Sequence, residues 1–223
     1  MNPKRKLIQT DDGSSSIYNE QLNETYHSTH GALQESRHVF INSGLKNFDK
    51  SPVRILEIGF GTGLNVLLSM EHALANNLHI EMVSLEAEPL EKILIDALNY
   101  AGQLNDPRAE TWFKWLHEQD WNMENTYEEF FTLTKRLGDW ITYEPGNDLY
   151  DIIFYDAFAP SRQPEMWTYS CITKACDTLK TDGCFVTYSA TGQLKRDLKQ
   201  AGMHVETLSG PPGKKEMVRA FRK

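Results

Sequence analysis

Three glycines alternate in the segment EIGFGTG, which begins at Glu57 and follows a short apolar run. Glycines at such a turn let the chain bend tightly and let a ligand approach the backbone, and a helix that begins there offers free N–H groups. A dinucleotide-binding turn has the spacing G-x-G-x-x-G, but the position of its third glycine is Leu64 here. Gly59, Gly61 and Gly63 therefore form a candidate turn for a different ligand.

Two further acidic residues follow apolar runs and could lie beside this turn. Glu86 ends the run 80–85, where a carboxylate can accept hydrogen bonds from both hydroxyls of a ribose. It could equally be a solvated glutamate at a strand end. Asp139 and Trp140 follow a later strand and could offer a carboxylate and a backbone N–H to the edge of an adenine.

A third candidate group begins with Asp156, directly after the apolar run 151–155. A carboxylate beside a reacting amine can position that amine and accept its proton, although Asp156 could instead cap the turn that follows. The nearby aromatic residues Phe158 and Trp167 could hold a flat base by stacking, or could belong to the core.

Strands and helices alternate along most of the chain, and this order would bring the three groups together. We expect strands at 53–58, 80–85, 151–155 and 183–188, helices at 64–75, 89–100, 169–179 and 191–202, and a final antiparallel pair at 203–208 and 216–221. Nearly continuous apolar strands are typical of a parallel sheet covered on both faces, which binds ligands at the carboxyl ends of its strands. The sequence therefore predicts a Rossmann-like α/β fold.

Residues 103–126 do not fit the alternation. The segment contains Trp112, Trp115 and Trp121 with several acids and shows no strand pattern, so we expect a helical insertion followed by a strand near 131–137. The three rings could form a base-stacking surface or could pack the insertion onto its domain.

Composition excludes several classes of protein. The 223 residues are 40% hydrophobic and carry a net charge of −8, with no apolar run long enough to cross a membrane and no signal peptide at the start. The three cysteines have no C-x-x-C spacing, and His27, His30 and His38 fit no usual ligand set, so we expect a reduced, cytoplasmic protein without a metal.

Several motifs resemble the methyltransferase domain of the MnmC family. They are EIGFGTGLN from Glu57, DAFAPSRQPEMW from Asp156, GKKEMVR from Gly213 and, in the opening segment, ETYHS from Glu24 and GALQESRHVF from Gly31. The resemblance covers nearly the whole chain in order. It implies a class I methyltransferase fold with S-adenosylmethionine as cofactor. The implied cofactor-binding residues are Glu57, Gly59, Gly61, Gly63, Glu86, Asp139, Trp140 and Asp156.

The activity that this resemblance implies is methylation of 5-aminomethyl-(2-thio)uridine at the tRNA wobble position, giving 5-methylaminomethyl-(2-thio)uridine. Asp156 would orient the amine and accept its proton. The implied substrate-binding residues are Tyr26, Arg37, Phe158, Trp167, Lys214 and Lys215. Arg37 could face a phosphate or could pair with an acid at the rim of the core.

The resemblance also predicts the organisation of the chain. Residues 1–50 are expected to pack on a catalytic domain at 51–223. Because the chain contains no second G-x-G-x-x-G, we expect the stand-alone form without an FAD-dependent oxidase domain. Upstream enzymes would then supply the aminomethyl uridine.

The negative net charge disfavours a nucleic-acid partner only as an average. Residues 190–223 contain eight Lys and Arg but three Asp and Glu. We therefore expect a basic rim at the mouth of the site, centred on Lys214 and Lys215, which Lys4, Arg5, Lys6 and Arg162 could join.

Two alternatives remain at this stage. A methyltransferase for a small-molecule amine would share the fold and the glycine turn. A non-catalytic binding module would keep the fold but is expected to show a damaged donor site, whereas every expected donor-site residue is present.

Overall fold

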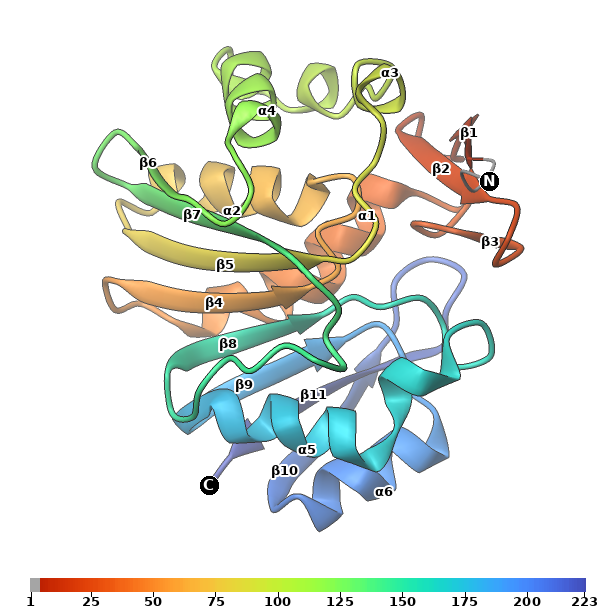
Figure 1. Cartoon of the computed structure of the whole chain (residues 1–223), viewed down its shortest axis with the longest axis vertical. Coiled ribbons are helices and arrows are strands. Elements are labelled where there is room, and N and C mark those ends of the chain that lie inside the picture. The colour runs from red at the N-terminus through yellow and green to blue at the C-terminus, as the bar shows by residue number, and fades with distance from the viewer. Residues whose placement is uncertain (1–4) are drawn as a thin grey trace.

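An eight-stranded sheet forms the centre of the computed structural model, which describes residues 5–223 (Figure 1). Its strand order is β10-β11-β9-β8-β4-β5-β7-β6, and the five strands from β9 to β7 run parallel. The strands are β4 (Val53–Ile58), β5 (Ile80–Glu86), β6 (Glu124–Tyr127), β7 (Phe131–Leu137), β8 (Tyr150–Tyr155), β9 (Leu179–Thr187), β10 (Met203–Ser209) and β11 (Glu216–Arg222). The predicted α/β fold, mostly parallel with an antiparallel C-terminal pair, is confirmed. The antiparallel edge strand β6 was not predicted.

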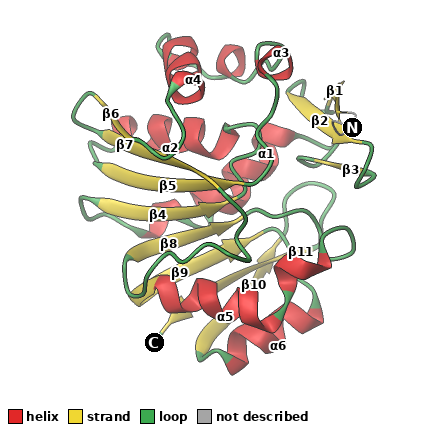
Figure 2. Ribbon diagram, in the orientation of Figure 1, coloured by secondary structure: helices red, strands yellow, loops and turns green. Residues whose placement is uncertain are grey.

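Helices cover both faces of this sheet (Figure 2). They are α1 (Ala32–Ser36), which continues into a π-helical segment (Arg37–Asn42), α2 (Leu64–Ala75), α3 (Lys92–Ile95), α4 (Ala109–Glu118), α5 (Tyr169–Thr178) and α6 (Gly192–Gln200). Short 3-10 turns occur at Leu45–Asn47, Ala101–Gln103 and Pro164–Trp167.

The side chains of β4 alternate between two separate cores. Ile55 packs in the core that contains α2 and α4, whereas Leu56 and Ile58 pack in the core that contains α5 and α6. Successive side chains of a strand point to opposite faces, so a strand covered on both faces is apolar at nearly every position. This explains why the apolar run predicted the strand correctly.

The prediction of a helix at 89–100 is wrong, because only the four residues of α3 are α-helical there. The side chain of Asn99 provides the physical reason. Its Oδ1 accepts hydrogen bonds from the N–H and the hydroxyl of Ser15, at 2.7 and 2.8 Å, and its Nδ2 donates to the carbonyl of Gly13. These long-range bonds hold the segment in turns.

The three tryptophans of residues 103–126 pack within the fold. Trp112, on α4, is buried; Trp115 packs on Tyr127, and Trp121 packs on Phe60. Helix α4 lies against α2, next to the glycine turn. Leu116 of α4 and Trp121, which packs on Phe60, therefore support the turn from behind.

The N-terminal strands form a second, three-stranded antiparallel sheet that the sequence did not predict. It comprises β1 (Arg5–Gln9), β2 (Ser15–Asn19) and β3 (Glu24–Thr25), and lies near the carboxyl ends of the central parallel strands (Figure 1). The Arg5 guanidinium fastens it there, pairing with the Glu88 carboxylate at 2.9 Å and donating to the carbonyl of Pro89 at 3.3 Å. Among residues 5–223, no helix is long and apolar enough to cross a membrane.

Shortening a buried side chain of α2 is expected to destabilise the fold. Leu67 is fully buried, so Leu67→Ala should lower the free energy of unfolding by about 2–5 kcal/mol through lost burial and a residual cavity. Urea unfolding followed by circular dichroism measures this. The control Ile93→Ala, at a side chain that is 77% exposed, should change the value by less than about 0.5 kcal/mol. Equal effects would contradict the assignment of α2 to the core.

Candidate active site

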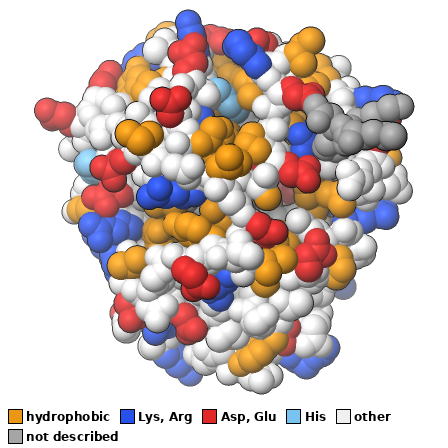
Figure 3. All heavy atoms as spheres, viewed as in Figure 1, with side chains coloured by type: hydrophobic (Ala, Val, Ile, Leu, Met, Phe, Trp, Pro, Cys, Tyr) orange, Lys and Arg blue, Asp and Glu red, His pale blue; other side chains and the backbone are white. Residues whose placement is uncertain are grey.

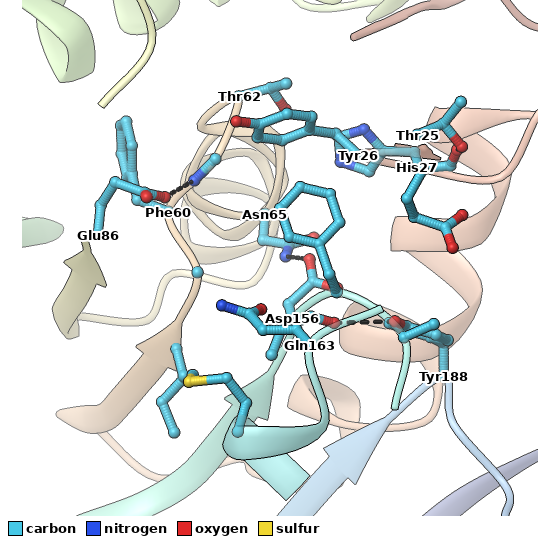
Figure 4. Close-up of a pocket in the computed structure, with 18 of the residues that line it drawn as sticks. Thr25, Tyr26, His27, Phe60, Thr62, Asn65, Glu86, Asp156, Gln163 and Tyr188 are labelled. Atoms are coloured by element: carbon cyan, nitrogen blue, oxygen red, sulfur yellow. Dashed lines mark hydrogen bonds between the residues drawn. The ribbon is translucent and has the colours of Figure 1, made fainter. Parts of the chain in front are cut away.

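A cavity of about 460 Å³ opens at the carboxyl ends of β4, β5 and β8, between the glycine turn and the segment that follows β3 (Figure 4). Its volume lies in the usual range for small-molecule sites. The predicted site residues that line it are Gly59, Gly61, Glu86, Asp139, Trp140, Asp156, Tyr26, Phe158 and Lys214. The predicted residues that do not line it are Glu57, Gly63, Arg37, Trp167 and Lys215.

The glycine turn leaves no room for side chains. Gly59 has φ +101°, and a Cβ there would lie 2.5 Å from the carbonyl oxygen of Asp156. Gly63 has φ +74°, and its Cβ would lie 2.7 Å from Leu116 on α4. Such φ values strain any residue with a side chain, so glycine is required at both positions. Gly63 acts from behind the turn, which explains why it does not line the cavity.

Glu86 holds the turn from the neighbouring strand. Its carboxylate accepts hydrogen bonds from the N–H of Gly61 at 2.9 Å and of Glu88 at 2.8 Å, and the first of these is drawn in Figure 4. Burial raises the pKa of Glu86, while the backbone donors oppose that shift. The carboxylate is therefore fixed in direction at the cavity wall.

Asp139 and Trp140 reach the cavity from the end of β7. The Asp139 carboxylate accepts a hydrogen bond from the N–H of Ile141 at 2.8 Å, so it caps its own turn. The Trp140 ring is buried, and its Nε1–H donates to the carbonyl of Cys171.

Asp156 follows β8 and faces the cavity from the side opposite Glu86. Its Oδ2 accepts a hydrogen bond from the Asn65 amide at 2.8 Å (Figure 4). Burial, and then the charge of Glu35, raise the pKa of Asp156 to about 7, while Asn65 and Lys214 oppose the shift. Asp156 can therefore take up and release a proton near neutral pH.

Lys214 brings a positive charge into the cavity. Its Nζ lies 3.0 Å from Oε1 of Glu35 and 3.7 Å from the centre of the Tyr188 ring. Glu35 in turn accepts a hydrogen bond from the N–H of Ser28 at 3.1 Å. Asn65 and Tyr188 were not singled out from the sequence, although Asn65 closes the quoted motif EIGFGTGLN.

Three residues expected to bind substrate lie outside the cavity. Arg37 pairs with Glu71 of α2 at 2.7 Å, which matches the alternative of an ion pair at the rim of the core. Trp167 packs on Tyr155, and its Nε1–H donates to the carbonyl of Phe158 at 2.7 Å, so it supports the loop that carries Phe158. Lys215 is exposed beyond the mouth.

The predicted basic rim is largely neutralised by ion pairs. Lys4 lies outside the described residues. The pairs are Arg5–Glu88, Lys6–Glu20, Arg162–Glu24, Lys195–Glu216, Lys214–Glu35, Arg219–Glu206 and Arg222–Asp148. Charges of both signs are interspersed on the face shown in Figure 3. Counting charges along a terminal segment overestimates such a rim, because some of the acids that pair with it, such as Glu35 and Asp148, come from elsewhere in the chain.

The histidines are placed by packing and local bonds. Burial, then Lys214, lower the pKa of His27 to about 4, which keeps the ring neutral at pH 7. The other two lie apart, with His30 beside Asp11 and His38 bonded to the carbonyl of Ser209. In the described part of the chain, no three potential ligands gather around a common point.

Adding a methyl group at the turn is expected to disrupt the site. Gly59→Ala would combine a positive φ, which costs about 1–3 kcal/mol, with a clash against the Asp156 carbonyl, so S-adenosylmethionine binding should be lost. Calorimetric titration and thermal unfolding measure both effects. The control Gly102→Ala adds a Cβ that meets nothing within 4 Å and should bind normally. Normal binding by Gly59→Ala would show that the turn does not contact the ligand.

Comparisons with known proteins identify the family of this chain. A family model described as S-adenosyl-L-methionine-dependent methyltransferase matches residues 102–223. The bifunctional protein MnmC of tRNA 5-methylaminomethyl-2-thiouridine biosynthesis from Acinetobacter baylyi is 30% identical over 229 residues, covering 94% of this chain and 36% of that protein. The MnmC protein of Leptospira borgpetersenii is 31% identical over 219 residues, covering 89% and 32%.

The chain thus spans about a third of the length of these relatives. Among solved structures, MnmC2 of Aquifex aeolicus matches with a TM-score of 0.82 and 27% identity, covering 100% of this chain and 71% of that one. The family model covers more than half of the chain. This chain belongs to the S-adenosyl-L-methionine-dependent methyltransferases.

Proposed function

We propose that this protein methylates the aminomethyl group of 5-aminomethyl-(2-thio)uridine at the tRNA wobble position. The observation that carries the proposal is Asp156, a half-buried carboxylate that faces the cofactor cavity and can hold a proton near pH 7. The MnmC relatives are named for biosynthesis of the product nucleoside, which supports this choice of amine. Other enzymes would then supply the aminomethyl uridine, and the reaction would take place with tRNA in the cytoplasm.

The lining of the cavity fits S-adenosylmethionine. Gly59 and Gly61 leave the backbone of the turn exposed, because a Cβ at either position would crowd its neighbours. Glu86 presents a fixed carboxylate suited to two ribose hydroxyls. Asp139 and the Trp140 backbone stand at the neighbouring strand end, where they can meet an adenine edge. When bound, the cofactor supplies a methyl group on a positively charged sulfur. An amine nitrogen can take this methyl group, and the sulfur is the leaving group.

Asp156 is the group that accepts the proton of the amine. An alkylamine has an unperturbed pKa of roughly 10.4, so it arrives protonated and must lose a proton before its lone pair can attack. The nitrogen–methyl bond then forms as the sulfur–methyl bond breaks, and its electron pair goes to sulfur. Asp156 accepts the proton, directly or through water, and Asn65 keeps its carboxylate directed at the cavity.

Aromatic residues provide a stacking surface for the uracil ring. Phe158 follows Asp156 on the same loop, and Tyr26 packs edge-on against it with 5.0 Å between ring centres. Tyr188 is fixed by a hydrogen bond from its hydroxyl to the carbonyl of Ala157 at 2.8 Å. Rings held in this way can stack on a base while the amine points at Asp156.

Mass spectrometry of tRNA nucleosides tests this function. The wild type with S-adenosylmethionine should add one methyl to 5-aminomethyl-(2-thio)uridine, and Asp156→Asn should reduce the rate at least about a hundredfold while calorimetry shows retained cofactor binding. The wild-type rate should fall as the pH drops below about 7, because Asp156 becomes protonated.

Each arm of this experiment can contradict the proposal. Methylation of free amines but not of tRNA would show a small-molecule methyltransferase. Absence of cofactor binding would indicate a non-catalytic module. Full activity of Asp156→Asn would remove the assigned proton acceptor while leaving the substrate assignment intact.

Phosphate contacts at the mouth predict a salt-dependent effect. Lys215 is exposed next to the cavity residue Lys214, so Lys215→Glu should weaken tRNA binding and reduce the slope of log affinity against log salt concentration by about 1. Filter binding at several salt concentrations measures this slope. The control Lys114→Glu reverses a charge that is 73% exposed on α4 and should leave the slope unchanged. Equal slopes for both variants would place the tRNA elsewhere.

A further inference from the structure

Glu57, the acidic residue ahead of the glycine turn, lies below the cavity rather than in it. It is fully buried in β4, and its Oε2 accepts a hydrogen bond from the hydroxyl of Ser84 on β5. Its other carboxyl oxygen, Oε1, is buried without a hydrogen-bond partner among the described residues. The resemblance implied that Glu57 binds the cofactor. Its position below the cavity does not place it in direct contact with a ligand there.

The surroundings of Glu57 disfavour a negative charge. The groups that act on it are the Ser84 hydroxyl, the Asn65 amide and the carboxylates of Asp156 and Glu86, with no cation among them. An ionised carboxylate oxygen that is buried without a donor is costly, and two nearby carboxylates add repulsion. A neutral carboxylic acid removes both penalties.

Asn65 connects Glu57 to the cavity. This side chain, on the first turn of α2, donates from Nδ2 to Oδ2 of Asp156 at 2.8 Å (Figure 4). It also contacts Glu57. An ionised Glu57 would compete for the amide N–H groups and repel the charge on Asp156. A neutral Glu57 leaves the amide committed to Asp156.

We infer that Glu57 and Asp156 together hold one proton and that this proton resides on Glu57. Asn65 then presents Asp156 to the substrate as the ionised member of the pair. Glu57 is then a positioning residue that acts through Asn65. The inference rests on the proposed function, since it concerns the carboxylate that accepts the amine proton. Burial is the main cause that raises the pKa of both carboxyl groups, and Glu57 is fully buried whereas Asp156 is half-buried, which favours the proton on Glu57.

The charges around the pair come from several elements. Glu86 at the end of β5 faces Glu57, and Glu35 of α1 and Lys214, in the loop before β11, act on Asp156. Glu35 and Lys214 pair with one another, and of the two Glu35 acts more strongly on Asp156. Full burial and the unpartnered Oε1 distinguish Glu57 from the half-buried Asp156, to which Asn65 donates at 2.8 Å.

Infrared difference spectroscopy tests the protonation state without any substrate. In the wild-type protein at pH 7, the band of a buried carboxylic acid should be present, and it should disappear in Glu57→Gln. The control Glu81→Gln, on the same strand as Ser84 in an exposed pair with Arg54, should leave the band in place. A wild-type spectrum without a band that Glu57→Gln removes would overturn the inference whatever the activity of the enzyme.

Kinetics test the positioning role. Glu57→Gln preserves a neutral group, so it should retain cofactor affinity within about threefold and kcat within about tenfold. Asn65→Ala should retain cofactor affinity but move the acidic limb of the kcat profile to higher pH, because Asp156 loses a donor that lowers its pKa. Loss of cofactor binding in Glu57→Gln would instead make Glu57 an anionic cofactor ligand. An unmoved limb in Asn65→Ala would remove Asn65 from the pathway.

Discussion

The parallel pairing of β4 with β8 is the constraint on which the site depends. Ile58 stands opposite Tyr155 in this ladder, and the carbonyl of Ile58 accepts a hydrogen bond from the N–H of Asp156 at 2.9 Å. The two strands therefore release their chains side by side, and Gly59 touches the Asp156 backbone where no Cβ fits. One ladder thus places the cofactor turn and the proton acceptor on adjacent walls of the same cavity.

The charge of the cavity suits its proposed ligands. Its acidic lining residues are Glu24, Glu35, Glu86, Asp139 and Asp156. Lys214 is the single Lys or Arg among the lining residues, and it is paired with Glu35. A wall of this kind attracts a sulfonium and an alkylammonium and repels phosphate. The phosphates of a tRNA must then stay outside, with only the modified base entering.

Local patterns predicted the parts of the site that lie on regular strands. Three local features were correctly placed at one edge of the sheet: the apolar run before Gly59, the acid that ends β5 and the acid that follows β8. Hydrophobic periodicity identifies the strands, and the order of the strands determines that edge. The N-terminal sheet was missed, since its strands are short and polar. Arg37 was assigned to the substrate because the sequence does not show that Glu71 lies within reach. Partners separated by long stretches of chain cannot be inferred from local periodicity.

The ion pair between Lys214 and Glu35 has a consequence for how the protein is made. Its two members are 179 positions apart, and the cavity wall draws on residues from both ends of the chain. Contacts this distant in sequence form late and slow the folding of a domain. During synthesis the sheet can begin to assemble from β4 to β8 while the active site is still incomplete. A polypeptide that ends before Lys214 therefore lacks this ion pair and the part of the cavity wall that Lys214 forms.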